Sequence, residues 1–332
     1  MSPNTLPVAV DAMGGDNAPL EIIKGAELAL EAGIPVMLVG QPEALSDVEG
    51  IPTKFASEVI GMGEDPATAV RKKKDSSLVR SAEAVRDGEA IAMVSAGNTG
   101  ATMASALLKI GRIRGVSRPA IATPIPVPGR SKPNILLDSG ANAECNPEWL
   151  VQFAEMGAVY ARDRFNTKKP KIGLLSIGEE PSKGSLLVKE AFGLLSEKDW
   201  QERCSGEFIG NVEGRDLMNP DVDVVVADGF TGNVALKTLE GTAKSIVTAL
   251  LDVFSSSPEA EEGAKLLAPS LLPLYETLDP ESVGGAILLG IKGVAMVSHG
   301  SSKAKAIFNA IATAFELSTD EHVRHLEHVI KR

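Results

Sequence analysis

The segment VAVDAMGGDNAP, from Val8 to Pro19, sets a pattern that repeats along this sequence. Glycines after an apolar run let the backbone approach a ligand closely or take a positive φ, and neighbouring aspartates can orient hydrogen-bond donors. The segment is therefore either one wall of an anion-binding site or a tight turn from a strand to a helix that Asn17 caps and Pro19 begins. The residues in question are Asp11, Gly14, Gly15, Asp16 and Asn17.

Six more short runs rich in Val, Ile and Leu follow along the chain. They are PVMLVG (35–40), AIAMVSAG (90–97), NILLDSG (134–140), KIGLLSIG (171–178), DVVVADG (223–229) and GVAMVSHG (293–300). Stretches with helical spacing and helix-start signals separate most of them, such as 19–33, which starts at a proline, and 146–165, where Asn146 precedes Pro147. Apolar strands that alternate with helices predict an α/β fold, with a mostly parallel sheet covered on both faces.

Most of these predicted strands end in a small or acidic residue followed by glycine. In an open α/β sheet, ligands bind outside the carboxyl ends of the strands, where the following helices also direct their N-terminal N–H groups. We therefore expect one shared crevice, with Val8–Pro19 as one wall. The residues expected to form it are Asp11, Gly14, Gly15, Asp16, Asn98, Thr99, Asp138, Asn142, Lys183, Asn211, Asp228, Thr231, Asn233, Lys237 and His299.

The composition of the 332 residues is that of an ordinary globular protein, with 44% hydrophobic, 23% charged and 4% aromatic residues. So few aromatic residues argue against recognition of nucleic acid by base stacking. The formal net charge of -11 also argues against a general affinity for nucleic acid or anionic lipid. An acidic partner would need a local basic patch, and the best one consists of Arg71, Lys72, Lys73 and Lys74.

The N-terminal residues MSPNTLP lack the basic start and apolar core of a signal peptide, and no apolar run is long enough to span a bilayer. The nearest approach, VGGAILLGIKGVAMV (283–297), is short, interrupted by glycines and contains Lys292. We interpret it as a buried passage from a helix to a strand. We expect a cytoplasmic protein.

The chain has no low-complexity linker and no repeat of fixed period. We predict one large α/β unit over residues 1–332. The proline-rich connection from Pro126 to Pro133 is at most a weak boundary between intertwined subdomains.

Several common catalytic motifs do not occur. The nearest match to the dinucleotide-binding glycine pattern, GMGEDP (61–66), has Pro66 where the third glycine should pack a helix against a strand. The sequence contains neither the phosphate loop GxxxxGK[ST] nor the GxSxG elbow of serine hydrolases. Cys145 and Cys204 make neither a disulfide framework nor a zinc site.

Two local patterns leave alternatives open. HVRHLEH (322–328) puts His322, His325 and His328 along one side of a predicted helix, either as metal ligands or as an exposed polar helix end. Cys145 lies just before a predicted helix start, where N–H groups can favour a nucleophilic thiolate, or it is an incidental packing residue. The crevice itself offers mainly amides and cations, with aspartates to orient them. Such a set suits binding of an oxyanion or phosphate better than abstraction of a proton.

Nine segments carry a resemblance that covers nearly the whole chain: VAVDAMGGDNAP, RKKKDSS, SAGNTGA, GVSRPAI, LLDSGAN, IGEEPSKG, GNVEGRD, DVVVADGFTGNVALKTLEG and GVAMVSHGSS. In this order they closely resemble the PlsX-type phosphate acyltransferases of bacterial phospholipid synthesis. The first segment and ADGFTGNVALKTLEG are highly specific to that family. SAGNTGA or LLDSGAN alone would not be.

The resemblance implies transfer of a long-chain fatty acyl group from acyl carrier protein to inorganic phosphate. The product, acyl phosphate, would pass to a downstream glycerol-phosphate acyltransferase in the membrane. The resemblance also implies a homodimer, no metal or organic cofactor, and a three-layer α/β/α fold similar to phosphotransacetylase and the isocitrate dehydrogenases.

Two segments depart from the family pattern. Ser185 stands where an asparagine is expected, which puts the contact beside Lys183 in doubt. Residues 255–276 correspond to part of a protruding helical region, expected over 255–285, that in relatives is often more basic and contacts membrane. Here the segment is acidic and contains only Lys265 as a cation. We therefore expect at most weak peripheral contact with a membrane.

Phosphate is already a nucleophile at neutral pH, so the protein needs only to hold it beside the thioester and stabilise the developing oxyanion. We expect the catalytic contacts from Asn98, Lys183, Asn233, Lys237 and His299. The two lysines and the N–H groups near Gly14 and Gly15 would bind phosphate, while the two asparagines would bind the carbonyl oxygen. His299 would either protonate the leaving thiolate or cap the last strand, and Arg71 to Lys74 would dock the carrier.

Three other functions stay open at this point. A phosphotransacylase for short acyl-CoA would use the same chemistry with another carrier. A hydride-transferring relative of the isocitrate dehydrogenase fold would bind NAD. A non-catalytic scaffold that recruits enzymes of lipid synthesis would not need so many polar strand ends.

Overall fold

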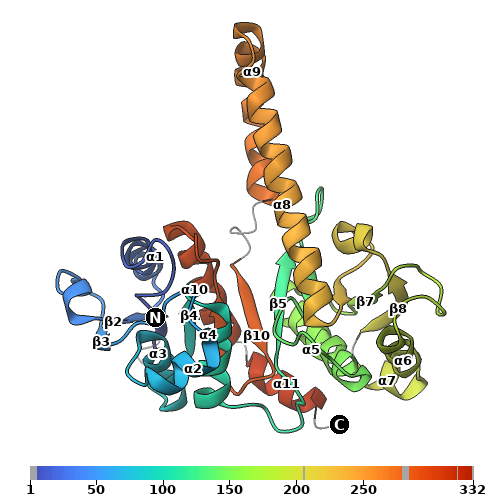
Figure 1. Cartoon of the computed structure of the whole chain (residues 1–332), viewed down its shortest axis with the longest axis horizontal. Helices are drawn as coiled ribbons and strands as arrows, with labels where there is room; N and C mark the ends of the chain where they lie inside the picture. Colours follow the sequence, from blue (N-terminus) through green and yellow to red (C-terminus); the bar gives the residue numbers. More distant parts are fainter. Residues whose placement is uncertain (1–5, 205, 279–283, 320, 331–332) are drawn as a thin grey trace.

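The computed structural model describes residues 6–204, 206–278, 284–319 and 321–330. These residues form one sheet of eleven strands (Figure 1), in the order β3-β2-β1-β4-β11-β10-β5-β6-β9-β7-β8. The strands are β1 (Val8–Asp11), β2 (Val36–Gly40), β3 (Thr53–Phe55), β4 (Ala92–Ser95), β5 (Ala120–Ile125), β6 (Asn134–Leu137), β7 (Lys171–Leu175), β8 (Glu207–Val212), β9 (Val224–Val226), β10 (Ala286–Leu289) and β11 (Val294–Val297).

The sheet changes direction at its centre. β3, β2, β1, β4 and β11 pair in parallel, and so do β6, β9, β7 and β8. Between these groups, β10 pairs antiparallel with β11 and with β5, and β5 pairs antiparallel with β6. The two parallel groups therefore run in opposite directions.

Helices cover both faces of the sheet, which gives the predicted three-layer α/β/α fold. On one face lie α1 (Leu20–Glu31), α5 (Pro147–Phe165), α6 (Leu186–Leu195), α7 (Lys198–Arg203), α10 (Ala304–Thr319) and α11 (His322–Ile330). On the other lie α2 (Pro66–Lys72), α3 (Ser77–Arg86), α4 (Thr99–Ser105) and the first turns of α8 (Gly229–Phe254). A π-helical turn (Ala106–Ile110) extends α4, and 3-10 turns occupy Pro42–Ala44 and Gly214–Met218.

The core follows the two-residue alternation of the strands. On the face of α1 and α5, one continuous apolar cluster runs from Val36 on β2 to Ile172 on β7. On the opposite face the core is divided. One cluster under α2, α3 and α4 includes Ile121 of β5, and another under α8 includes Ile125 of the same strand. Thr123 lies between them on the same strand face, at the interruption of the core.

The seven strands predicted from apolar runs are confirmed, and β3, β5, β8 and β10 were not predicted. The interpretation of 283–297 as a helix-to-strand passage is wrong, because its described part forms the antiparallel strands β10 and β11. The connection from Pro126 to Pro133 joins β5 and β6, which pair with each other. Asn17 does not cap α1 through its side chain, which instead donates to the carbonyl oxygens of Ser301 and Ser302.

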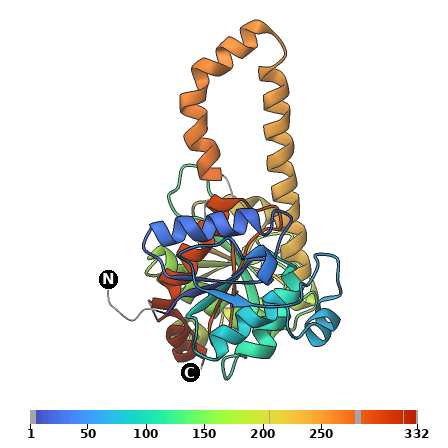
Figure 2. The same ribbon diagram turned by 90° about the vertical axis from the view of Figure 1, so that its left-hand side faces the viewer.

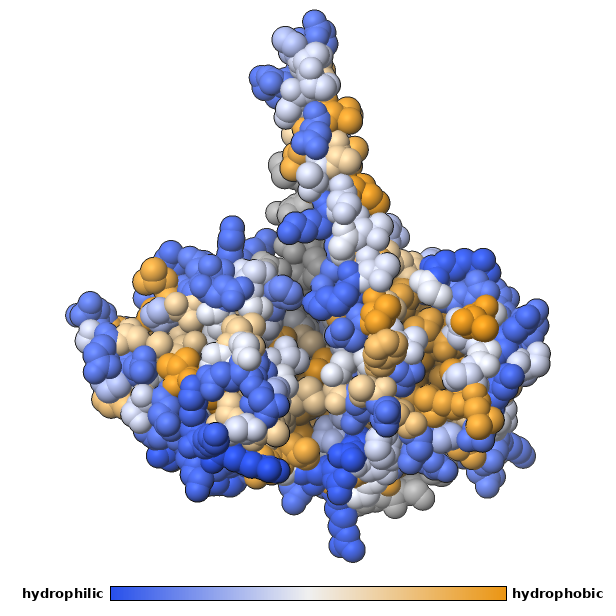
Figure 3. All heavy atoms as spheres, viewed as in Figure 1, coloured by the Kyte–Doolittle hydropathy of each residue, from blue (hydrophilic) through white to orange (hydrophobic). Residues whose placement is uncertain are grey.

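A helical hairpin projects from the body of the molecule (Figures 1 and 2), made of the outer part of α8 and of α9 (Pro258–Leu278). The range 255–285 thus takes in the turn and α9 but not the outer part of α8, and residues 279–283 lie outside the described residues. Apolar surface is exposed along the hairpin (Figure 3), where Ile246 is 56% and Leu266 is 79% exposed. None of the described helices is both long and apolar enough to cross a membrane.

Candidate functional site

A cavity of about 330 Å³ lies where the core of the second face is interrupted. It is lined by Thr123 of β5, by the first residue of α4, by the end of β11 and the residues after it, by the loop after β6 and by α8. Most of its polar lining is contributed by Thr99, Thr123, Ser139, Asn233, Lys237, Glu240, Ser298 and His299. The cavity combines an amide, several hydroxyls and a cation, which are groups that can bind an anion.

The expectation that all polar strand ends share one edge is wrong. β1, β4 and β11 run opposite to β6, β9 and β7, so the carboxyl ends of the two groups point in opposite directions along the strands. The two groups of strands still meet at the cavity because the chain after β6 continues alongside β5, where Ser139 N donates to Ile121 O at 3.0 Å. The cavity thus receives Thr99 and His299 from one group and Asn233 from the other.

The N-terminal end of α8 is held against the loop after β6. A side chain at Gly232 would overlap the carbonyl oxygen of Asp138, and one at Gly229 would lie 2.6 Å from the carbonyl oxygen of Asn142. Asn233, in the same turn, donates from Nδ2 to Ser139 O at 3.0 Å. One Nδ2–H of Asn233 remains for a ligand, and the close packing of two glycines fixes where it lies.

Asp138 shapes that loop rather than the cavity surface. Its buried carboxylate accepts from the N–H groups of Ile121, Gly140, Ala141 and Asn142 and from Asn142 Nδ2, at 2.8–3.2 Å. Burial raises the pKa of the carboxyl, although these donors favour its charged form. Because its oxygens are occupied by five donors, Asp138 is a positioning residue and the prediction that it binds substrate directly is not supported.

Three other residues predicted to bind substrate, Asn142, Asp228 and Thr231, also form hydrogen bonds within the protein. Asn142 donates both Nδ2 protons, to Pro119 O and to Asp138, at 2.8 and 2.9 Å. Asp228 caps α8 by accepting from Thr231 N and Thr231 Oγ1 at 2.8 and 2.7 Å. These contacts orient the helix start and correct the expectation of direct substrate contacts from these side chains.

Lys237 and His299 face the cavity with partners of their own. Lys237 Nζ lies 2.8 Å from a carboxylate oxygen of Glu240, and both side chains line the cavity. His299 Nδ1 lies 2.8 Å from Ser301 Oγ. The cation is thus paired but exposed to the cavity, and an anion that binds there would compete with Glu240 for it.

Asn98 has a different role from the one predicted. It caps α4 by accepting from Ala101 N at 3.0 Å, and its Nδ2 donates to Met62 O and Glu64 O at 2.8 and 3.1 Å. No amide proton remains for a thioester oxygen, so the predicted direct contact is corrected. Asn98 instead holds the loop before α2 against α4, while its neighbour Thr99 lines the cavity.

The opening segment packs beside the cavity without lining it. The Asp11 carboxyl is buried, accepts from Ser95 Oγ at 2.7 Å, and has its pKa raised by that burial. A side chain at Gly14 would lie 2.7 Å from Gly97 N, and Gly15 has a φ of 107°. Asp16 N donates to the carbonyl oxygen of the loop after β11 at 2.7 Å. The glycines therefore allow close packing of loops, and their N–H groups stay only predicted phosphate donors.

Lys183 and Asn211 lie at the carboxyl ends of β7 and β8, and neither lines the cavity. Asn211 Nδ2 donates to Glu180 O at 2.9 Å, which holds the loop that carries Lys183. Ser185 caps α6 by accepting from Val188 N at 3.3 Å. The structure thus gives the unexpected serine a structural role. A contact from Lys183 to phosphate stays a prediction.

Neither alternative that the sequence left open is a reactive centre. Burial raises the pKa of the Cys145 thiol to about 12, and its Sγ lies 3.6 Å from Asn142 O. His322 is buried, and its Nδ1 lies 2.7 Å from Asp163, which also contacts His325 at 3.1 Å. Burial opposes ionisation of Asp163, but the two histidines lower its pKa. Both interpretations of His322, as part of an exposed helix end and as a metal ligand, are therefore wrong. Among the described residues, no group of three or more His, Cys, Asp or Glu side chains could hold a metal ion.

The predicted basic patch is only partly available. Lys73 Nζ lies 2.5 Å from Glu64 and 2.7 Å from Val59 O. Arg71 and Lys72 in the last turn of α2 and Lys74 just after it are exposed and make no ion pair within the described chain.

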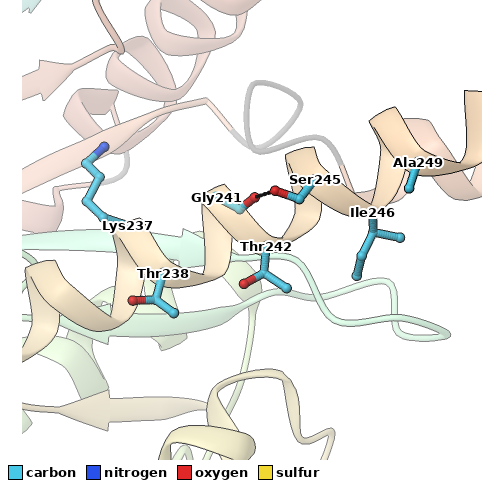
Figure 4. Close-up of a pocket in the computed structure, with 7 residues that line it drawn as sticks. All are labelled: Lys237, Thr238, Gly241, Thr242, Ser245, Ile246 and Ala249. Carbon is cyan, nitrogen blue, oxygen red and sulfur yellow. Dashed lines mark hydrogen bonds between the residues drawn. The ribbon is translucent and has the colours of Figure 1, made fainter. Parts of the chain in front are cut away.

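A second, shallow hollow along one face of α8 is open to solvent (Figure 4). It is lined by Lys237, Thr238, Gly241, Thr242, Ser245, Ile246 and Ala249. Ser245 Oγ is turned back to Gly241 O at 2.9 Å, so the helix itself satisfies that hydroxyl. Lys237 lines both hollows, which makes them neighbours on α8.

Several cavity residues were missed from the sequence, among them Thr123, Ser139 and Ser298. Thr123 Oγ1 and Ser139 Oγ lie 2.6 Å apart. The only sequence signal for Thr123 was a polar residue at an alternate position of an apolar strand, between Ile121 and Ile125. Ser298 directly precedes His299, and the sequence favoured the histidine because its side chain can transfer a proton.

Comparisons with known proteins give the family of this chain. A family model described as fatty acid synthesis protein matches residues 6–324. A protein of Heliobacterium modesticaldum named phosphate acyltransferase is 48% identical over 317 residues, which cover 92% of each chain. One of Leptospira biflexa with the same name is 47% identical over 320 residues, or 93% of this chain and 92% of its own.

Solved structures give the same fold at low sequence identity. A phosphotransacetylase from Streptococcus pyogenes aligns with a TM-score of 0.63 and 17% identity, over 96% of this chain and 95% of its own. The EutD phosphotransacetylase from Staphylococcus aureus aligns with a TM-score of 0.60 and 18% identity, over 94% of each chain. At these identities the likeness shows the fold alone.

Proposed function

The chain belongs to the fatty acid synthesis protein family, as do its relatives named phosphate acyltransferase, and from this we propose that it is an enzyme that transfers an acyl group to phosphate. The acyl group is a long-chain fatty acyl group carried by acyl carrier protein, and the product, acyl phosphate, is used in phospholipid synthesis. The observation that supports this best is the cavity in which Asn233 and Lys237 of α8 face Ser298 and His299 after β11.

The reaction needs no group from the protein to form a bond with the acyl chain. An oxygen of phosphate attacks the thioester carbonyl carbon, the carbon–sulfur bond breaks, and the carrier thiolate leaves and takes up a proton. The free Nδ2–H of Asn233 stabilises the oxyanion, a type of contact that contributes about 10²–10³ in rate. Lys237 holds phosphate, and His299 lies where it can give the thiolate a proton.

The proposed acyl donor, acyl carrier protein, is large and carries an apolar acyl chain. Two features of the structure support such a donor. The hollow along α8 begins at Lys237 and includes Ile246 and Ala249, so it offers an apolar path away from the cavity. The exposed cations Arg71, Lys72 and Lys74 offer a landing site to an acidic carrier near Asn98 and Thr99. Charge reversal of Lys72 should raise the KM of the carrier and flatten its salt dependence.

We also propose a homodimer in which the apolar side chains of α8 and α9 are covered by a second copy. Contact with membrane is weak, because the described start of α9 carries Glu259, Glu261 and Glu262. Flotation with anionic liposomes at physiological salt should recover little protein.

The test is consumption of a long-chain acyl carrier protein that depends on phosphate, with acyl phosphate trapped by hydroxylamine. A parallel assay uses acetyl-CoA as the donor. Activity with the long-chain carrier and little with acetyl-CoA supports the proposal. The reverse preference would make the protein a phosphotransacylase for short acyl-CoA.

A further inference from the structure

Ser298 directly follows β11 at the wall of the cavity and has a buried hydroxyl. Its side chain is 5% exposed, and its Oγ has no hydrogen-bond partner among the described residues. A buried hydroxyl without a partner destabilises a folded protein, so it calls for a partner that binds later. We propose that the Ser298 hydroxyl binds an oxygen of inorganic phosphate, an inference that rests on the function proposed above.

The hydroxyl is held in place by the sheet. Ser298 N donates to Ser95 O at 2.9 Å, and the preceding residue, Val297, pairs with Ser95 on one side and Ala286 on the other. Gly285 has a φ of 79°, and a side chain there would lie 3.4 Å from Ser298 Oγ. Because the hydroxyl is buried in its present rotamer, it must turn toward the cavity to meet a ligand, and the absent side chain at Gly285 leaves room for that turn.

The surroundings of Ser298 suit a tetrahedral oxyanion. The cavity also presents the hydroxyl of Thr123 and the ammonium group of Lys237, while its one carboxylate, Glu240, is paired with that ammonium group. The 16-residue helix α10 also begins nearby, but its first N–H group, from Ala304, already donates to the Glu21 carboxylate at 2.9 Å. Phosphate has four oxygens that can accept from donors in several directions, whereas a thioester carbonyl offers one.

The position of Asn233 supports a division of the cavity between the two reactants. Ser298 comes from β11 and Asn233 from α8, so their donors enter from different walls. Phosphate between Ser298 and Lys237, and the thioester oxygen at Asn233 one helical turn before Lys237, would place the reacting atoms next to each other. Ser298 is not set up as a nucleophile, because His299 Nδ1 is directed to Ser301 Oγ.

The experiment compares Ser298→Ala and Ser298→Thr with Ser105→Ala. Ser105 is a matched control, since its hydroxyl in α4 is also buried without a partner but lies outside the cavity. The first readout is the rise in Tm caused by potassium phosphate, against potassium chloride of the same ionic strength and with no acyl donor. The second is the KM for phosphate and for acyl carrier protein.

We expect Ser298→Ala to lose most of the Tm rise and to raise the KM for phosphate about tenfold or more, with the donor KM within about twofold. Ser298→Thr keeps a hydroxyl and should retain most phosphate binding, and Ser105→Ala should match the wild type. The inference is overturned if phosphate does not raise the Tm of the wild type, if Ser298→Ala keeps the Tm rise, or if mass spectrometry finds an acyl group on Ser298. If the wild type transfers no acyl group but Ser298→Ala alone loses the Tm rise, the phosphate contact stands and the proposed function fails.

Discussion

The two ends of α8 share one continuous helix but have opposite surroundings. At the inner end, Gly229 and Gly232 are buried against the loop after β6, and Leu236 packs in the core. At the outer end, Leu250 is 46% and Leu251 is 58% exposed. The inner end is fixed by contacts within the chain, whereas the outer end has little beyond its own hydrogen bonds and α9.

This difference separates two tasks on one element. A catalytic donor must be held within a fraction of an ångström, and only the inner end has the packing to do so. The outer end exposes a series of large apolar side chains, which soluble proteins rarely leave uncovered. We infer that the inner end serves chemistry and the outer end serves association with the acyl chain or a second copy.

The strongest test of the inner end is Gly232→Ala. The new Cβ would overlap Asp138 O, so the helix or the loop must move, and we expect a loss of about 3 kcal/mol or more in unfolding free energy. In α9, Gly263→Ala is the matched change, because nothing lies within 4 Å of the new Cβ. There we expect a gain of about 0.5–1 kcal/mol from helix propensity. Urea unfolding measures both, and equal effects would remove the proposed contrast between helix ends.

The next largest effect concerns catalysis. We expect Asn233→Ala to lower kcat about 10²–10³-fold with little change in the KM for phosphate, because we propose that the amide stabilises the oxyanion. Its loss leaves Ser139 O without a donor but makes no large cavity. Thr248→Ala, at the outer end, should stay within about twofold of the wild type because it removes only a contact to the helix backbone. A fall in kcat of the same size in both variants would place the effect in the whole helix rather than in one donor.

The sequence predicted much of this fold because buried strands are short apolar runs. It did not predict that β10 and β5 are antiparallel, since strand direction leaves no mark on a two-residue alternation. It therefore placed all strand ends on one edge. Of the predicted site residues, Thr99, Asn233, Lys237 and His299 line the cavity, but caps and ligands look alike in sequence. Asn98, Asn142 and Asp228 proved to be occupied by backbone groups, while Ser298, whose hydroxyl is free, was passed over.

A smaller effect is expected at the outer end. Leu250→Ser removes an exposed apolar side chain, so it should leave folding of the monomer nearly unchanged and weaken self-association about tenfold. Sedimentation over a range of concentrations measures this, with Thr248→Ala as the control on the same helix. If Leu250→Ser dimerises like the wild type, the covered face of the dimer lies elsewhere.

The smallest effect is expected at Cys145, although it lies beside the inner end of α8. The thiol has its pKa raised to about 12, so it is neutral at pH 7, and it does not line the cavity. With the proposed direct attack of phosphate on the thioester, Cys145→Ala should keep activity within about twofold of the wild type. The sharper measurement is intact-protein mass spectrometry after mixing the enzyme with acyl carrier protein in the absence of phosphate. We expect no acyl adduct, because phosphate is the proposed nucleophile, even though Ser301 Oγ lies 2.8 Å from His299 Nδ1 in the cavity. An acyl group that phosphate removes at the rate of turnover would contradict direct attack, and the residue that carries it would then be the nucleophile.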